Sequence, residues 1–318
     1  MKKVLKITGK VLLAVLIILV LFLAGVFIFN KIMLFKEKSL IRNQKFGQLI
    51  EVDGHNMSIS VSGEGERTLV FMAGAGASAP IIDYTPFAER FNDDHKCVII
   101  EKFGYGFSDD YDGARDVETR VRQSRDVLKA AGVNAPYILC PHSYSGLEAI
   151  YWAQNYPDEI EAIIGLDMAV PQSYDSYDEE LIKSVISADS FKRAIRDTGL
   201  LRLLVGNTIP KDFTEETRQL IIALMCRTYG NQTASNEVNN IISDIKVIDN
   251  KNVPDVPTLL IISDGTIADG WIDFEMDYAA SISEVTTVQL DCGHSVHKHE
   301  PDKCENAMRE FIADLETD

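Results

Sequence analysis

The chain has 318 residues, 46% of them hydrophobic, and carries 31 lysines and arginines against 48 aspartates and glutamates. Residues 1–45 hold nine basic residues and one acidic residue, so the remaining chain holds 22 basic and 47 acidic residues. A domain with this charge is repelled by nucleic acid and by anionic lipid, which argues against either as its substrate. The five cysteines are widely spaced and form no C-x-x-C pair, so we expect neither a disulfide framework nor a metal site.

The chain begins with a basic head, residues 1–10, and continues with an apolar run, residues 11–29, that contains no charged residue. A helix of this length rises about 28 Å, close to the ~30 Å hydrocarbon layer of a bilayer. A cleaved signal peptide is the alternative, but it would have a shorter apolar region and an A-x-A-like cleavage site. Basic residues flank the run on both sides, so the positive-inside rule favours one orientation only weakly. We expect a single-pass cell-membrane anchor with a cytoplasmic head, a linker at residues 30–46 and the remaining chain outside the cytoplasm.

Past the linker, short apolar runs alternate with segments of helical periodicity. A hairpin is expected around Asp53-Gly54, with strands at 48–52 and 56–61. Further strands are expected at 68–72, 97–100, 137–140, 160–166, 258–262 and 285–290, and helices at 86–91, 117–131, 146–155 and 302–315. The alternation predicts an α/β fold with a mostly parallel, eight-stranded sheet flanked by helices.

Residues 171–253 interrupt this alternation. Apolar residues repeat at helical spacing behind Asp178, a candidate N-cap, and Gly199 is placed to end that helix. A second helix is expected at 220–225. The sequence therefore predicts a core of residues 47–170 and 254–318, interrupted by a helical insertion at residues 171–253, which the resemblance described next identifies as a cap.

Four stretches that follow predicted strands have the residue types of a catalytic site. They are Ala73-Gly74-Ala75-Gly76, the Glu101–Asp109 turn, the tight turn Pro141-His142-Ser143-Tyr144-Ser145-Gly146, and Asp291-Cys292-Gly293-His294. In this order they resemble the oxyanion loop, the turn after the fourth strand, the nucleophile elbow and the histidine loop of the α/β-hydrolase superfamily. The resemblance implies the α/β-hydrolase fold, with a helical cap over the active site.

The resemblance also assigns roles to individual residues. Ser143 would be the nucleophile, held at positive φ by the sharp turn, and His294 would be the general base. The backbone N–H groups of Ala75 and Tyr144 would form the oxyanion hole. The elbow departs from the family at Pro141, where a small residue is usual. The oxyanion loop departs at Ala73, where the family commonly has histidine.

The acid of the triad has two candidates. The family most often places it after the seventh strand, but the matching position here is Thr266, and the nearby Asp264 is out of register. Some members, including the fluoroacetate dehalogenase-like group, carry the acid after the sixth strand instead. The stretch Leu166-Asp167-Met168-Ala169-Val170-Pro171 is similar to their turn. Asp167 is therefore the first choice, and Asp264 is the alternative.

The resemblance implies a serine hydrolase. Dehalogenases and epoxide hydrolases attack with aspartate, so Ser143 indicates an acyl-enzyme route on a small ester, thioester or amide, without cofactor or metal. An aminopeptidase of the proline iminopeptidase type is one variant of this activity. The departures at Ala73 and Pro141 leave a second hypothesis, a catalytically inactive ligand sensor or binding protein at the membrane.

Two further patterns have weaker support. Gly74-x-Gly76-x-x-Ala79, with Glu101 after the next strand, matches a dinucleotide-binding fingerprint. The hairpin in front of it argues against that interpretation, and so does the stretch 80–82, which we expect to delay the helix. His294, His297 and His299 lie within six residues but have no zinc-binding spacing, so a metal site is not expected.

Overall fold

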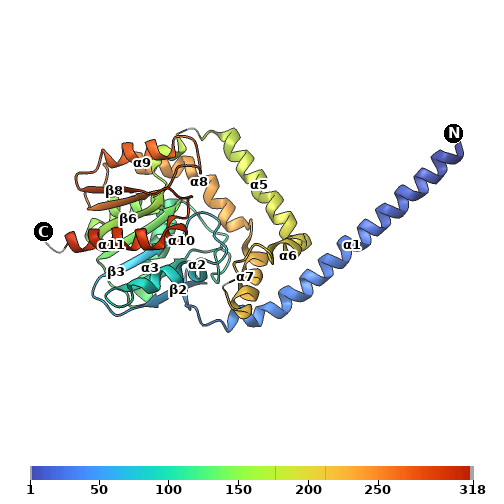
Figure 1. Ribbon diagram of the computed structural model, residues 1–318, viewed down its shortest axis with the longest axis horizontal. Coiled ribbons are helices and arrows are strands. Elements are labelled where there is room, and N and C mark those ends of the chain that lie inside the picture. The colour runs from blue at the N-terminus through green and yellow to red at the C-terminus, as the bar shows by residue number, and fades with distance from the viewer. Residues whose placement is uncertain (1, 176, 212, 316–318) are drawn as a thin grey trace. The chain divides into compact units, whose positions relative to one another are not determined.

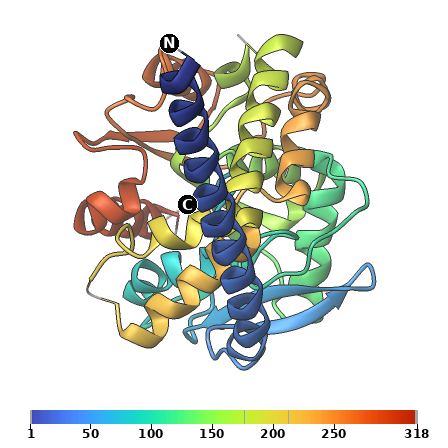
Figure 2. The same cartoon turned by 90° about the vertical axis from the view of Figure 1, so that its right-hand side faces the viewer.

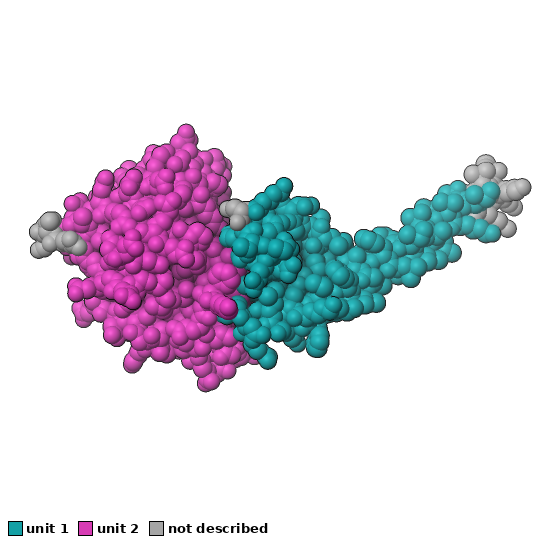
Figure 3. Space-filling model, turned by 60° about the horizontal axis from the view of Figure 1, so that its bottom comes forward, with its two compact units in different colours: residues 1–44, 188–230 teal, residues 45–187, 231–318 magenta. Residues whose placement is uncertain are grey.

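The computed structural model describes residues 2–175, 177–211 and 213–315. The chain divides into two compact units (Figure 3). Unit 1 comprises residues 1–44 and 188–230, and unit 2 comprises residues 45–187 and 231–318. The division cuts through the segment expected to form the cap, so the cap boundaries at 171–253 remain a prediction.

Unit 2 contains an eight-stranded sheet with the strand order β1-β2-β4-β3-β5-β6-β7-β8 (Figure 1). β1 pairs with β2 and β2 with β4 in antiparallel fashion, and all the other pairs are parallel. Every strand predicted from the sequence is present. The strands are β1 (Gln48–Val52), β2 (His55–Ser62), β3 (Thr68–Met72), β4 (Lys96–Glu101), β5 (Tyr137–Ser143), β6 (Ile160–Met168), β7 (Thr258–Ile262) and β8 (Val285–Gln289).

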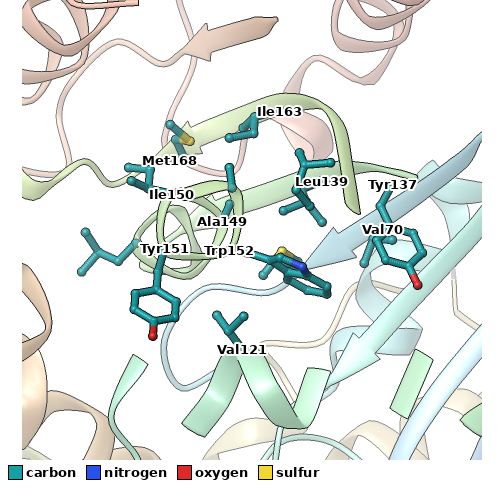
Figure 4. Packing of buried hydrophobic residues seen from close by; sticks show 14 of the residues in the cluster. Val70, Val121, Tyr137, Leu139, Ala149, Ile150, Tyr151, Trp152, Ile163 and Met168 are labelled. Atoms are coloured by element: carbon teal, nitrogen blue, oxygen red, sulfur yellow. The ribbon is translucent and has the colours of Figure 1, made fainter. Parts of the chain in front are cut away.

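Both faces of the sheet are covered, which explains why its central strands are apolar throughout. All five residues of β3 are buried. Val70 belongs to the large apolar cluster that also contains Leu139 and Trp152 (Figure 4). Phe71 points to the other face, where its ring centroid lies 6.1 Å from that of Tyr84. A strand buried on two sides has no polar alternation, as the sequence indicated.

The helices of unit 2 agree with most of the predictions. They are α2 (Pro80–Ala88), α3 (Val117–Ala130), α4 (Ser145–Asn155), α8 (Gln232–Asp249), α9 (Trp271–Ala279), α10 (Val296–His299) and α11 (Pro301–Asp314), with 3-10 turns at Glu89–Phe91, Pro157–Glu159 and Pro171–Tyr174. The expected start at residue 86 is wrong, because α2 begins at Pro80. Proline lacks an N–H and has φ fixed near the helical value, so it suits the first turn.

Helices α8 and α9 were not predicted. The inward face of α8 carries the buried polar residues Ser235, Glu237 and Asp244, which break the apolar periodicity of a core helix. Its N-cap is Asn231, whose side chain accepts a hydrogen bond from the backbone of Ala234. Both helices contribute buried side chains to the candidate active site.

Unit 1 contains α1 (Lys2–Arg42), α6 (Leu200–Val205), α7 (Glu215–Thr228) and the C-terminal part of α5 (Glu179–Thr198). α5 begins and ends as predicted. The Asp178 carboxylate accepts a hydrogen bond from the backbone of Leu181, and Gly199 follows the helix with φ of 85°. The helix expected at 220–225 is part of α7.

α1 is one unbroken helix (Figures 1 and 2). It continues past Phe29 to Arg42, so most of the segment expected as a linker is helical. Residues 30–42 contain good helix formers and no proline or glycine, and part of them packs against α6 and α7. The part from Ile7 to Arg42 is long and apolar enough to cross a membrane.

The start of α4 lies very close to the end of β6. A Cβ atom at Gly146 would collide with the carbonyl oxygen of Ala169 and would approach the Cβ of Met168 to 3.0 Å. We expect Gly146→Ala to lower the free energy of unfolding by about 3 kcal/mol or more, because backbone atoms cannot move aside as a side chain can. Thermal unfolding of the detergent-solubilised chain tests this.

The matched control is Gly206→Ala in unit 1, where a Cβ would meet open space. Equal melting temperatures for Gly146→Ala and the control would contradict the crowding at the α4 start.

Candidate active site

The elbow between β5 and α4 has the geometry expected for a nucleophile. Ser143 adopts φ of 53°, a strained backbone conformation for a residue that is not glycine. Its carbonyl oxygen accepts a hydrogen bond of 2.8 Å from the backbone N–H of Ala169. The Ser145 hydroxyl donates to the carbonyl oxygen of Met72 at 2.7 Å and ties the turn to β3. Pro141 is accommodated within β5, opposite Met72.

The predicted oxyanion loop lies against this elbow. A Cβ at Gly74 would lie 2.8 Å from the Cβ of Ser143, so only glycine allows the loop to come this close. Ala75 lines the same cavity as Ser143. The next backbone N–H, that of Gly76, donates to the hydroxyl of Tyr105 at 3.0 Å. Tyr105 therefore holds the loop in place, although Ala73 stands where the α/β-hydrolase superfamily commonly has histidine.

Asp167 and His294 form a direct contact. Asp167 is fully buried at the C-terminal end of β6, with φ of 51°, and its Oδ2 lies 2.5 Å from Nδ1 of His294. Its Oδ1 accepts hydrogen bonds from the backbone N–H of Ser263 at 2.7 Å and from Nε1 of Trp271 at 3.0 Å. Burial acts to raise the pKa of Asp167, but the hydrogen bonds from His294 and Ser263 outweigh it and the pKa is lowered. The carboxylate therefore stays ionised.

The alternative acid is placed differently. The Asp264 carboxylate accepts hydrogen bonds from the backbone N–H and the hydroxyl of Thr266, at 3.0 Å and 2.7 Å, in a local turn on the surface. These bonds to Thr266 lower the pKa of Asp264. Of the two candidate acids, Asp167 is the one in contact with His294.

Ser143 and His294 line one cavity of about 360 Å³. His142 also lines it, with Nε2 3.1 Å from the carbonyl oxygen of His294. Burial and the proximity of His294 lower the pKa of His142 to about 4, so its ring is neutral at physiological pH. The buried His297 ring stacks on Tyr84 at 4.5 Å. Among the residues that the structure describes, no cluster of His, Cys, Asp or Glu side chains could hold a metal ion.

A buried cluster of charges lies beneath the elbow, and the sequence did not indicate it. Six of its side chains form salt bridges: Lys102, Arg115, Arg120, Glu148, Glu237 and Asp244. The cluster touches both sides of the predicted oxyanion hole. Tyr105, which accepts from Gly76, donates to Glu237 at 2.7 Å, and the hydroxyl of Tyr144 lies 3.2 Å from Arg120. Despite burial, the neighbouring cations lower the pKa of Glu237 to about 2, so it remains a carboxylate.

Helix α9 supplies two more residues that were missed. Trp271 holds Asp167, and Glu275 lies one helical turn further along, with no exposed surface. Neither carboxyl oxygen of Glu275 has a hydrogen-bond partner within the described part of the chain. Burial and the negative charge of Asp167 raise the pKa of Glu275 well above its usual value, so the group is a neutral acid. The spacing of Trp271, Glu275, Tyr278 and Ala279 is the helical signal that could have revealed them.

The dinucleotide interpretation fails on the role of Glu101. Its buried carboxylate accepts hydrogen bonds from the backbone N–H of Ile81 at 3.0 Å and of Phe107 at 2.7 Å. It fixes the start of α2 and the turn after β4, so it cannot bind a ribose. The argument from a delayed helix is also wrong, because α2 begins directly after Ala79.

Comparisons with known proteins place the chain in a family. The uncharacterized protein YbdG of Bacillus subtilis is 31% identical over 327 residues, a match that covers 98% of this chain and 97% of YbdG. The chain belongs to the YbdG family. No protein-family model matches it.

Solved structures that are similar to this chain establish its fold. The Cif epoxide hydrolase of Acinetobacter nosocomialis has a TM-score of 0.68 and 16% identity, with 90% of this chain and 96% of that chain covered. An epoxide hydrolase mutant of Vigna radiata has a TM-score of 0.68 and 13% identity, with 84% and 98% covered. They confirm the predicted α/β-hydrolase fold. At this identity the likeness extends to the fold and not to an activity.

The neutral state of Glu275 predicts a pH-dependent stability. A group whose pKa is raised by folding contributes stability below its unfolded pKa of about 4.3, and that contribution is lost as the pH rises towards the folded pKa. The free energy of unfolding should fall by up to about 1.4 kcal/mol per pH unit in this window. In Glu275→Gln this loss is absent, because the amide does not ionise.

Thermal unfolding of the detergent-solubilised full chain at pH 5 and pH 8 measures the effect. We expect the melting temperature of Glu275→Gln to rise relative to the wild type as the pH increases. A difference that does not change with pH would contradict a neutral Glu275.

Proposed function

We propose that this protein is a membrane-anchored serine hydrolase that cleaves a small carboxylic ester, thioester or amide through an acyl-enzyme intermediate. The observation that carries the proposal is the arrangement of three side chains. Ser143 stands at positive φ on the elbow and shares a cavity with His294, whose other face is bonded to the buried Asp167. Nucleophilic catalysis by serine needs a base near the hydroxyl and an acid that orients the base, and these three side chains supply those groups.

The contacts assign a role to each ring nitrogen of His294. Its Nδ1 lies on the ionised Asp167 and therefore carries the proton, which leaves Nε2 as the base. In the proposed reaction Nε2 takes the proton of Ser143 as its Oγ attacks the substrate carbonyl carbon. The histidine then donates that proton to the leaving group, and a water activated by the same nitrogen releases the acid.

The negative charge on the carbonyl oxygen needs donors near the elbow. The backbone N–H groups of Ala75 and Tyr144 remain our proposal for this oxyanion hole. The close approach of Gly74 to Ser143 supports it, since Ala75 is the next residue along the loop. Tyr144 directly follows the nucleophile at the start of α4, where the N-terminal end of the helix favours negative charge.

The cavity favours an acyl substrate without a free amine. Asp83 has the one carboxylate among the lining residues that the structure describes. Asp83 is paired with Lys298, with Nζ 3.3 Å from Oδ2, so it is not free to bind an N-terminal ammonium group. This favours an esterase-like activity over an aminopeptidase of the proline iminopeptidase type.

The proposed anchor is the apolar segment 11–29 of α1. In this arrangement the basic head is cytoplasmic and the acidic hydrolase core is outside the cytoplasm. The length and the exposure of the apolar part of α1 support the anchor, because an exposed apolar helix of this length is stable in lipid and unfavourable in water.

A fluorophosphonate probe tests the proposed nucleophile. We expect the detergent-solubilised full chain to be labelled at Ser143 and Ser143→Ala to lose the label, because the probe reacts only with an activated hydroxyl. Tandem mass spectrometry of the labelled peptide locates the modification. Folded wild-type protein that stays unlabelled would support the inactive ligand-binding alternative instead.

The two candidate acids can be separated by amide substitutions. Asp167→Asn removes the charge that holds His294 Nδ1, so we expect hydrolysis of a p-nitrophenyl ester to fall by about 10³–10⁴-fold. Asp264→Asn is the matched control and should leave the rate unchanged, since its carboxylate bonds Thr266 in its own turn and not His294. The reverse pattern of rates would make Asp264 the acid.

A further inference from the structure

Unit 1 holds α6 firmly against the end of the apolar part of α1. At Gly199 the backbone comes so close to α1 that a Cβ there would lie 2.6 Å from the Cβ of Asn30 and 3.0 Å from the carbonyl oxygen of Val26. The buried Asn30 side chain accepts from Nε of Arg202 at 3.0 Å and donates to the carbonyl oxygen of Arg196 at 3.3 Å. These contacts fix the beginning of α6 at the level of residues 26–30.

A second contact fixes α6 further along α1. Nη1 and Nη2 of Arg202 donate to the two carboxylate oxygens of Glu37, at 2.6 Å and 2.8 Å. The side chains of both residues are less than a tenth exposed. A bidentate, buried ion pair keeps a defined geometry, so α6 cannot slide along α1.

The depth of α6 in a bilayer follows from these contacts. If the apolar run 11–29 crosses the hydrocarbon layer, Val26 lies about 5 Å inside its edge, at 1.5 Å per residue. Asn30 lies just outside the edge, so Gly199, which contacts both Val26 and Asn30, lies at the boundary between the acyl chains and the headgroups. α6 begins at that boundary.

The composition of α6 fits this position. Its sequence is Leu200–Val205, with Arg202 as its one polar residue. Leu201 and Val205 are buried within unit 1, whereas Leu203 and Leu204 are 50% and 63% exposed. A short helix in water would carry polar side chains on its exposed face, and a helix that is apolar all round is typical of burial or of lipid contact.

The neighbouring surface has the charge expected next to lipid headgroups. Lys31, Lys36, Lys38 and Arg42 are all exposed on α1, directly after the apolar run. A groove of about 560 Å³ between α1, α6 and α7 is lined by both apolar and charged side chains, including Phe29, the last residue of the run, Leu203 and Lys36. Basic residues beside a membrane span attract anionic headgroups.

We propose that Leu203 and Leu204 of α6 enter the interfacial layer of the membrane beside α1, as a second membrane contact. The partner is the lipid bilayer itself, with anionic headgroups near the basic residues of α1. This inference rests on the proposed anchor. It adds that Leu203 and Leu204, far from α1 in sequence, contact the membrane interface beside the span.

Tryptophan reporters test the contact in the full-length chain, reconstituted in vesicles of phosphatidylcholine and phosphatidylglycerol. Leu204→Trp adds a reporter at the tip, Leu21→Trp adds one within the span, and Leu49→Trp adds one at a similarly exposed leucine of unit 2. The signal of the native Trp152 and Trp271 is subtracted using the wild-type chain. Quenching is measured with lipids brominated either near the headgroup or near the end of the acyl chain.

We expect the fluorescence added by Leu204→Trp to be quenched, and more strongly by bromine near the headgroup than by bromine near the chain end. Leu21→Trp should be quenched more strongly than Leu49→Trp by both lipids. If Leu21→Trp is quenched but Leu204→Trp is quenched no more than Leu49→Trp, the second contact is overturned and the anchor stands. Absence of quenching at Leu21→Trp would overturn the anchor, and the second contact with it.

Discussion

The carboxylate of Asp167 is the interaction on which the arrangement of the site depends. It accepts three hydrogen bonds, from the backbone after β7, from the indole of α9 and from His294 in the loop after β8. Hydrogen bonds to a charged group contribute about 1.5–3 kcal/mol each, so the three together exceed the cost of about 1–3 kcal/mol for the positive φ of Asp167. One buried charge therefore joins the end of β6 to segments that lie 96 to 127 residues further along the chain.

The charge cluster beneath the elbow has a comparable effect on the other half of the site. Burying three cations and three anions is costly in solvation, and removing one member of such a pair costs about 3–5 kcal/mol because the other is left unpaired. The cluster bonds the hydroxyls of Tyr105 and Tyr144, which belong to the turn after β4 and to the elbow. The side chains that support the two sides of the proposed oxyanion hole thus share one polar network.

The chain combines surfaces of opposite character. All of its acidic excess lies beyond residue 45, while the first 45 residues are apolar and basic. Unit 1 also holds the most exposed large apolar side chains outside the apolar run, among the residues that the structure describes: Phe35, Phe191 and Leu204. Segment 188–230 belongs to unit 1, although it follows most of unit 2 in the sequence.

The sequence by itself determined the strands and the order of the motifs. It also named Ser143 and His294 as candidates, with Asp167 as the first choice of acid and Asp264 as the alternative. It could do so because doubly covered strands are continuous apolar runs and because a tight strand-to-helix turn needs small residues at fixed positions. The helix α8 was not predicted because its inward face carries Glu237 and Asp244, which interrupt the apolar periodicity. In α9 the buried Glu275 interrupts an otherwise apolar face.

Tertiary structure alone decided which acid meets the histidine. Asp167 and Asp264 both follow a strand, and only the fold shows that the first reaches His294 while the second bonds Thr266 in its own turn. The same holds for the contact of Gly199 with Val26 and Asn30, which joins segments about 170 residues apart. The local sequence pattern predicts which helix or strand a segment can form, whereas long-range contacts depend on how the segments pack.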